Sequence, residues 1–236
     1  MKKKFSLIFV FYFLVFSAFL LVTVAGSRAI TVFSESQPVD RMHTVVIDPG
    51  HGGIDGGATS CTGVLESGIN LEISLRLRDL LHFLGMKTAM TRSTDTSIHS
   101  QGNTIAAQKM SDLKERAALV CNTENAVLVS IHQNTFSESR YSGAQVFYAA
   151  DAQSKQLAAQ LQTVIGTSLN PGSSRKAKSA QGIYLMEHID CTGILVECGF
   201  LSNPEEEAKL RNAGYQKDVC CVIACSLSTF LNGNPS

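Results

Sequence analysis

The chain has 236 residues, of which 44% are hydrophobic and 17% are charged, a balance that excludes disordered, collagen-like and highly charged proteins. Its 20 basic residues are matched by 20 acidic ones, so no overall positive charge attracts nucleic acid. The absence of Trp also disfavours a protein that only binds carbohydrate.

The amino terminus has the pattern of an export segment. Lys2, Lys3 and Lys4 precede an uncharged apolar run over residues 5–24, and small residues suited to cleavage follow it. The run is long enough to cross a bilayer as a helix. We predict a signal peptide or a membrane anchor over residues 1–26 and a polar linker over residues 27–42. Everything beyond this segment is then extracytoplasmic, and we expect membrane contact only through it.

The rest of the chain, residues 43–232, alternates short β-rich runs with helical patterns. Strands are predicted over residues 43–48, 87–90, 127–131, 144–148 and 193–196. Helices are predicted over residues 66–84, with Gly85 as the carboxyl-terminal cap, and over 112–121, 151–168 (N-cap Asp151), 205–211 and 216–231. Residues 94–111 and 170–182 are predicted to be surface loops. This alternation predicts a single α/β domain with a mostly parallel, twisted sheet flanked by helices.

The seven cysteines are odd in number and lack a regular spacing, so they predict neither a disulfide framework nor a metal site built from thiols. Cys221 and Cys225 lie four residues apart in an apolar stretch, and we expect them to share a buried helix face.

Three ionisable residues stand at the carboxyl ends of predicted strands. They are His51, His132 and Glu197, and a fourth residue, Glu66, lies in the first turn of the helix that follows His51. Because the carboxyl ends of parallel strands meet at one edge of a sheet, we expect these four side chains to lie close together.

Two histidines and one carboxylate are the ligands of a catalytic zinc site that keeps a position open for water. We therefore predict Zn²⁺ bound by His51, Glu66 and His132, with Glu197 as the general base. The glycines around His51 would allow close approach to metal and substrate. Asp48 and Asp55 are expected to orient His51.

Each assignment has an alternative. Glu66 could act only as a favourable charge at its helix terminus, and Glu197 could form a buried ion pair with Arg116. The glycine-rich loop lacks the end of a phosphate-binding loop, which disfavours a nucleotide site. The remaining histidines follow no strand end and are expected to be ordinary surface or core residues: His43, His82, His99 and His188.

Four ordered motifs carry a resemblance to a known family. They are residues 46–58 (VIDPGHGGIDGGA), Glu66 followed by Asn70 and Leu71, residues 130–134 (SIHQN) and residues 196–203 (VECGFLSN). In these motifs the chain resembles the zinc-dependent N-acetylmuramoyl-L-alanine amidases of the bacterial cell wall, over about residues 43–230. The resemblance implies zinc on His51, Glu66 and His132, and Glu197 as the catalytic glutamate.

The resemblance also implies a reaction. Such amidases hydrolyse the amide bond between the lactyl group of N-acetylmuramic acid and L-alanine in peptidoglycan. Residues 108–113, 175–178 and 184–185 look similar to the branch that trims spore cortex for muramic-lactam formation and germination. Gln133 departs from the small residue common in the family, and no autoinhibitory helix insertion is visible, which points to control by an accessory activator protein.

Two other functions are compatible with these residues. One is a zinc peptidase that cuts within the stem peptide, and the other is a noncatalytic wall-binding protein that keeps the fold. The candidates for binding stem-peptide carboxylates are Arg92, Arg175 and Lys178.

Overall fold

The computed structural model describes residues 43–233, which belong to one folded unit beginning at His43. The predicted leader (1–26) and linker (27–42) lie outside the described residues and stay predictions. Within residues 43–233, no helix is both long enough and apolar enough to span a bilayer.

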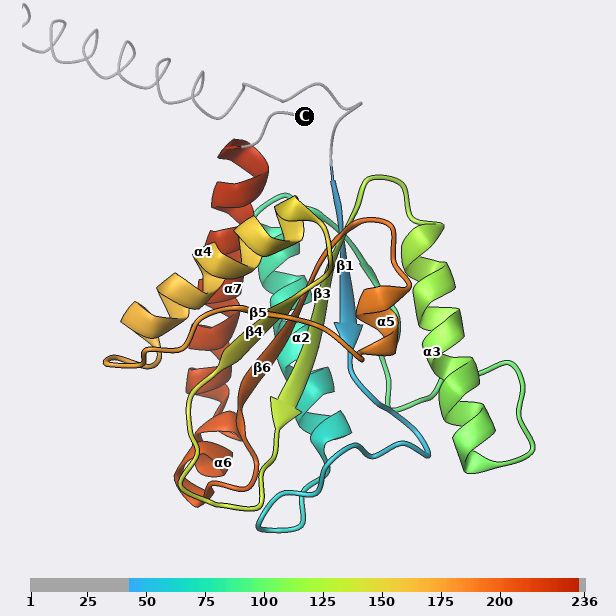
Figure 1. Cartoon of the computed structure of the whole chain (residues 1–236), viewed down its shortest axis with the longest axis horizontal. Coiled ribbons are helices and arrows are strands. Elements are labelled where there is room, and N and C mark those ends of the chain that lie inside the picture. The colour runs from blue at the N-terminus through green and yellow to red at the C-terminus, as the bar shows by residue number, and fades with distance from the viewer. Residues whose placement is uncertain (1–42, 234–236) are drawn as a thin grey trace, which may run out of the picture. The chain divides into compact units, whose positions relative to one another are not determined.

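Six strands form one sheet in the order β2-β1-β3-β6-β4-β5 (Figure 1). Neighbouring strands are parallel except β4, which is antiparallel to β6. The predicted α/β fold with a mostly parallel sheet is thus confirmed. The strands are β1 (Thr44–Pro49), β2 (Lys87–Met90), β3 (Ala126–Asn134), β4 (Gln145–Tyr148), β5 (Lys178–Ser179) and β6 (Thr192–Phe200).

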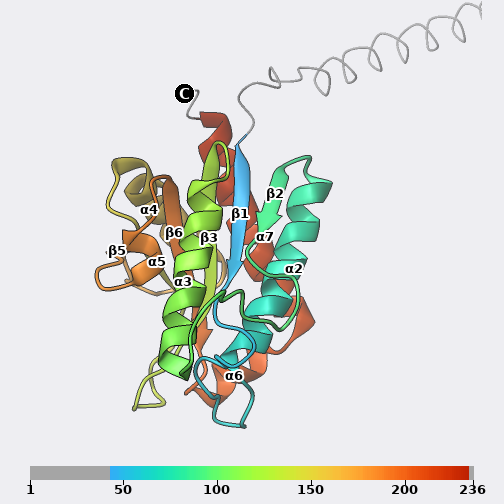
Figure 2. The same cartoon turned by 90° about the vertical axis from the view of Figure 1, so that its right-hand side faces the viewer.

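Helices cover both faces of the sheet, and Figure 2 shows the sheet between α2 and α3. Side chains of α2, α4 and α7 pack in one core cluster, and those of α3 and α5 pack in a second. The helices are α2 (Glu66–Phe83), α3 (Ile105–Cys121), α4 (Ala152–Ser168), α5 (Tyr184–Glu187), α6 (Pro204–Leu210) and α7 (Ala213–Gly233).

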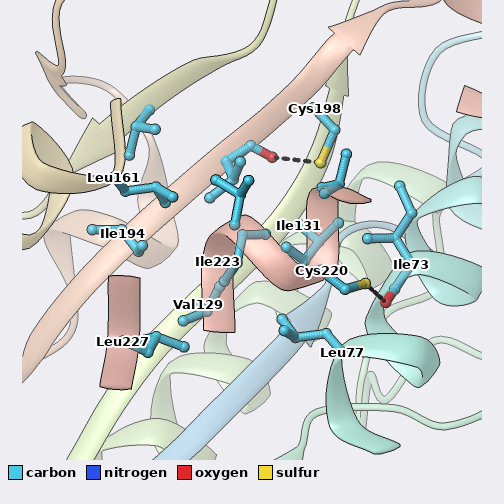
Figure 3. Close-up of a cluster of buried hydrophobic side chains, with 14 of the residues drawn as sticks. Ile73, Leu77, Val129, Ile131, Leu161, Ile194, Cys198, Cys220, Ile223 and Leu227 are labelled. Atoms are coloured by element: carbon cyan, nitrogen blue, oxygen red, sulfur yellow. Dashed lines mark hydrogen bonds between the residues drawn. The ribbon is translucent and has the colours of Figure 1, made fainter. Parts of the chain in front are cut away.

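The inner strands are buried on both faces, as expected for a parallel sheet between two helical layers. In β1, Val45 and Ile47 belong to the first cluster, whereas Val46 belongs to the second. Figure 3 shows the first cluster, where side chains from the sheet, α2 and α7 meet. Burying each large apolar side chain contributes about 1.5–3 kcal/mol, so this cluster holds α2 firmly against β1 and β3.

Two predicted helix caps are present. Asp151 accepts a hydrogen bond from the main-chain N–H of Ser154 (2.8 Å) at the start of α4. Gly85 has a φ of 78°, and the next N–H, that of Met86, donates to the carbonyl of Leu81 (2.9 Å). This pairing ends α2 in the manner typical of a glycine cap.

Helix α3 begins at Ile105 rather than at Asp112, so part of the predicted loop 94–111 is helical. Thr104 caps this helix, with its side chain accepting from the N–H of Ala107 (3.2 Å). Most residues in the first two turns are exposed. These turns therefore lack the periodic apolar residues from which the helix was predicted. Helix α5 and strand β5 were not predicted because elements of four and two residues carry no periodic signal.

The prediction for Cys221 and Cys225 is wrong, because both are exposed. Helix α7 instead buries Cys220, whose thiol donates to the carbonyl of Ile73 in α2 (3.4 Å; Figure 3). Its buried stripe runs through Val219, Ile223 and Leu227, at helical spacing. All seven cysteines lie within the described residues and all are free, so no disulfide framework is present there.

Candidate metal centre

Three of the predicted site residues meet at the carboxyl edge of the sheet. His51 follows β1, Glu66 is the first residue of α2, and His132 lies in β3. One ligand atom from each lies within 4.8 Å of the others. Nε2 of His51 is 3.2 Å from Oε2 of Glu66, and Nδ1 of His132 is 3.0 Å from Oε1 of Glu66. Within residues 43–233, no other group of three such side chains converges in this way.

The backbone around His51 is shaped for this convergence. His51 adopts a φ of 61°, in the left-handed region that costs a non-glycine residue energy. Its carbonyl accepts from Nη2 of the buried Arg116 (2.7 Å), which helps to hold the conformation. A side chain at Gly57 would lie 2.6 Å from both Glu66 and the His51 ring. The glycine is needed there because the candidate ligands pack directly against the loop.

Asp55 makes the expected contact with His51. Its Oδ2 lies 2.8 Å from Nδ1 of His51, and its Oδ1 lies 2.7 Å from Nζ of Lys109. A carboxylate on Nδ1 leaves Nε2 to face Glu66, which is the arrangement common for metal-binding histidines. Burial would lower the pKa of His51, but hydrogen bonds and charges from Glu66 and Asp55 outweigh it and raise the pKa to about 9.

Asp48 does not contact His51, contrary to the prediction. Its carboxylate accepts hydrogen bonds from Nη1 of Arg116 (2.7 Å), from Thr91 (2.6 Å) and from Ser130 (2.6 Å). Burial would raise the pKa of Asp48, but Arg116 and these hydrogen bonds lower it to about 2. Asp48 therefore acts on the loop only through Arg116, which links Asp48 to the His51 carbonyl.

Both oxygens of the Glu66 carboxylate accept hydrogen bonds from the surrounding chain. Oε2 accepts from the N–H of Ala58 (2.9 Å), and Oε1 accepts from Nδ2 of Asn70 (3.1 Å) and from the N–H of Gln133 (3.1 Å). Burial would raise the pKa of Glu66, but the two histidines lower it well below its usual range. The carboxylate is thus held ionised and faces the histidines, so a role limited to the helix terminus does not describe it.

Glu197 lies beside these three residues. It is the register partner of His132 on the neighbouring parallel strand, so both side chains stand on the same face of the sheet. Oε2 of Glu197 is buried and has no hydrogen-bond partner within the described residues. Burial is the main cause that raises the pKa of Glu197 to about 7. The alternative ion pair with Arg116 is wrong, because Arg116 binds Asp48 and Asp112 instead.

Arg92 is not available to substrate, and its predicted role in binding stem-peptide carboxylates is wrong. The side chain is buried and donates to four main-chain carbonyls, those of Pro49, Gly50, Ser67 and Thr94. These bonds fasten the loop before His51 to the start of α2. An arginine in a polar loop looks exposed in sequence, and only the fold shows which carbonyls it satisfies.

Two motif residues that were given no role in the site, Asn70 and Gln133, carry buried amides next to Glu66: the Asn70 amide bonds the Glu66 carboxylate, and the Gln133 amide bonds Asn70. Asn70 stands four residues after Glu66, on the same helix face, and this spacing was the available signal. The four histidines left aside lie outside the site, as expected: His43, His82, His99 and His188.

The donor set fits a zinc ion. It offers two imidazoles and one ionised carboxylate, which is a known catalytic zinc combination. On the neighbouring strand Glu197 adds a buried carboxylate with an unbonded oxygen, which is suited to accept a proton from a water molecule.

Comparisons with known proteins give a consistent result. The sequence profile of the N-acetylmuramoyl-L-alanine amidases matches residues 45–228. The chain is 38% identical over 181 residues to the germination-specific N-acetylmuramoyl-L-alanine amidase of Bacillus subtilis, covering 76% of each protein. It is similar in structure to the CwlD amidase of Clostridioides difficile, solved in complex with the GerS lipoprotein, with a TM-score of 0.78 and 34% identity over 81% of this chain and 100% of that one. The catalytic domain of CwlV from Bacillus (Paenibacillus) polymyxa has a TM-score of 0.67 at 28% identity, over 82% of this chain and 100% of that one.

Proposed function

The chain belongs to the N-acetylmuramoyl-L-alanine amidase family, and from this premise we propose that His51, Glu66 and His132 bind zinc while Glu197 is the catalytic base. The protein is an amidohydrolase that acts on peptidoglycan. Its target is the amide bond between the lactyl group of N-acetylmuramic acid and L-alanine. The observation that carries the proposal is the meeting of Glu197 with the three candidate ligands at one sheet edge.

The metal and the carboxylate have separate tasks. When bound, zinc would act as a Lewis acid and lower the pKa of a water molecule to near 7. Glu197 takes a proton from the attacking water and passes it to the nitrogen of L-alanine. The carbonyl carbon–nitrogen bond breaks, the water oxygen completes a carboxyl group on the lactyl side, and the stem peptide leaves with a free amino group. Burial of the Glu197 carboxyl raises its pKa above the ordinary value, which favours holding the proton between the two transfers.

The test is release of stem peptide from purified peptidoglycan. Glu197→Gln should slow release by about 10²–10⁴-fold while the protein still binds one zinc. His132→Ala should lose both the metal and the activity. If Glu197→Gln keeps full activity, the assignment of the base is wrong. Mass spectrometry of the products distinguishes cleavage at L-alanine from cleavage within the peptide.

We also propose a biological setting. Because the substrate is peptidoglycan, the protein acts outside the cytoplasm, and residues 1–26 are proposed to direct it there. The similarity to a germination-specific amidase supports a role in spore cortex. A spore former that lacks its own germination amidase should regain muramic-lactam when it produces this chain.

An accessory partner is a further part of this proposal. The similar CwlD amidase was solved with a lipoprotein bound, which supports an activator for this chain as well. Activity on peptidoglycan that rises when such a lipoprotein is added would support this. Unchanged activity would contradict it.

Arg175 stays a candidate for binding a stem-peptide carboxylate. Its Nη2 donates to the carbonyl of Ser142 (2.8 Å), and its guanidinium lies 5.2 Å from the centroid of Phe200, three residues beyond Glu197. Among the ion pairs within residues 43–233, none includes Arg175. Its charge is therefore free for an anionic ligand. Arg175→Gln should raise KM more than it lowers kcat. Lys178, exposed in β5, is the weaker candidate.

A further inference from the structure

Two buried side-chain amides connect the separate parts of the metal centre. Asn70 is 0% exposed and Gln133 is 3% exposed. Nδ2 of Asn70 donates both to Oε1 of Glu66 (3.1 Å) and to the carbonyl of Gly50 (3.1 Å), the residue before His51. Nε2 of Gln133 in turn donates to Oδ1 of Asn70 (3.1 Å). The two amides thus link β3, α2 and the loop after β1.

The direction of these hydrogen bonds fixes the orientation of the Asn70 amide. Its NH₂ group faces two oxygens that only accept, namely the Glu66 carboxylate and the Gly50 carbonyl. A flipped amide would place Oδ1 against both of them. Gln133 supplies the one donor that Oδ1 needs in the present orientation, so the amide is set from both sides.

Gln133 itself is incompletely bonded. Its Oε1 is buried without a hydrogen-bond partner in the part of the chain that the structure describes. A buried polar atom without a partner destabilises a fold, so Gln133 is not explained as a residue that only stabilises the core. Its NH₂ group, by contrast, has a defined target. We therefore attribute the role of Gln133 to its NH₂ group, which donates a hydrogen bond to Asn70.

We propose that Gln133 is a positioning residue for the metal centre, acting through Asn70 on Glu66 and on the Gly50 peptide. This rests on the proposed function, in which Glu66 and His51 bind zinc. Removing a group that hydrogen-bonds to a metal ligand and orients it typically weakens metal affinity by about 10–100-fold. The same range is expected for loss of the Gln133 amide.

The experiment measures Zn²⁺ affinity of the full chain by competition with a chromogenic chelator. Gln133→Met keeps the length of the side chain but removes the donor, and it should weaken Zn²⁺ binding by about 10–100-fold. In an Asn70→Ala background the same change should have no further effect, because its target is gone. Gln162→Met is the matched control, since Gln162 is a buried, hydrogen-bonded glutamine of α4 that makes no contact with the ligands. It should bind zinc like the wild type.

The outcomes separate the two proposals. If the wild-type chain binds no zinc, the proposed function fails, and this inference fails with it. If the wild type binds zinc and Gln133→Met binds it equally well, only the positioning role is overturned. Equal losses in the wild-type and Asn70→Ala backgrounds would overturn the route through Asn70. Should Gln133→Met not fold, Gln133→Asn takes its place, because its amide is one carbon too short to reach Asn70.

Discussion

Replacing Gly50 with Ala should remove the metal centre while leaving the protein folded. A Cβ atom at Gly50 would lie 2.2 Å from both Cε1 and Nε2 of His132. Ordinary contacts begin at 3.4 Å, so either the ring or the Gly50 backbone must move by roughly 1 Å. The backbone is held by three hydrogen bonds: its N–H donates to Ile131 (3.0 Å), and its carbonyl accepts from Asn70 (3.1 Å) and Arg92 (2.9 Å). The His132 ring is therefore the part that moves.

A shift of this size is several times what coordination allows. Metal–ligand distances are held within about 0.2 Å, so a His132 ring displaced by roughly 1 Å cannot keep its place among the ligands. Overpacking of this kind also lowers the free energy of unfolding by about 1–3 kcal/mol, which most domains of this size survive. We expect Gly50→Ala to be folded by circular dichroism, to hold far less than one zinc per chain and to release no stem peptide.

Gly68→Ala is the matched control. Gly68 lies in α2, two residues after Glu66, and a side chain there meets nothing within 4 Å. Ala in a helix interior is more favourable than Gly by about 0.5–1 kcal/mol, so this variant should be slightly more stable and fully active. If Gly50→Ala binds zinc and cleaves peptidoglycan like Gly68→Ala, the placement of His132 against Gly50 is refuted.

Two further predictions concern stability. The pKa of Asp48 lies at about 2 against an ordinary 3.8, so its carboxylate contributes about 2 kcal/mol that is present above about pH 4 and lost as the pH falls towards 2. In urea unfolding, the wild type should lose about that much more than Asp48→Asn between about pH 5 and about pH 2, and parallel pH profiles would contradict the role of Arg116. Cys220→Ser should lower the free energy of unfolding by about 1–3 kcal/mol because it puts a hydroxyl into the core, whereas exposed Cys221→Ser should change it by less than about 0.5 kcal/mol. Equal effects would mean that α7 presents a different face.

The order of the elements and the convergence at the sheet edge could be predicted from local pattern. Short apolar runs indicated β1, β3 and β6 because strands buried on both faces are continuous in hydrophobicity. His51, His132 and Glu197 follow from the rule that parallel strands end at a common edge, and that rule needs no knowledge of which strands are neighbours. The direction of β4 was beyond this reasoning, since the same four residues suit either direction.

Features that depend on contacts between distant segments could not be predicted. Arg92 and Arg116 both lie in polar surroundings in sequence, and only the fold shows that Arg92 bonds main-chain carbonyls whereas Arg116 bonds carbonyls and also pairs with the carboxylates of Asp48 and Asp112. The face of α7 is a similar case. Apolar residues occur all round that helix, so the sequence pattern did not indicate whether Cys220 or Cys221 is buried. Packing of α7 against α2 and α4 determines that it is Cys220.

Glu197 and His132 are register partners on adjacent strands. The position of the proposed base relative to the proposed ligand therefore depends on the register between β3 and β6. Side chains alternate between the faces of a strand, so removing one residue before Glu197 in β6 would turn that carboxylate into the apolar layer beneath α2 and α7. Insertions in surface loops that do not contact the metal centre should have little effect on activity. Between Thr192 and Glu197, by contrast, deleting a single residue should abolish activity because it shifts Glu197 to the opposite face of β6.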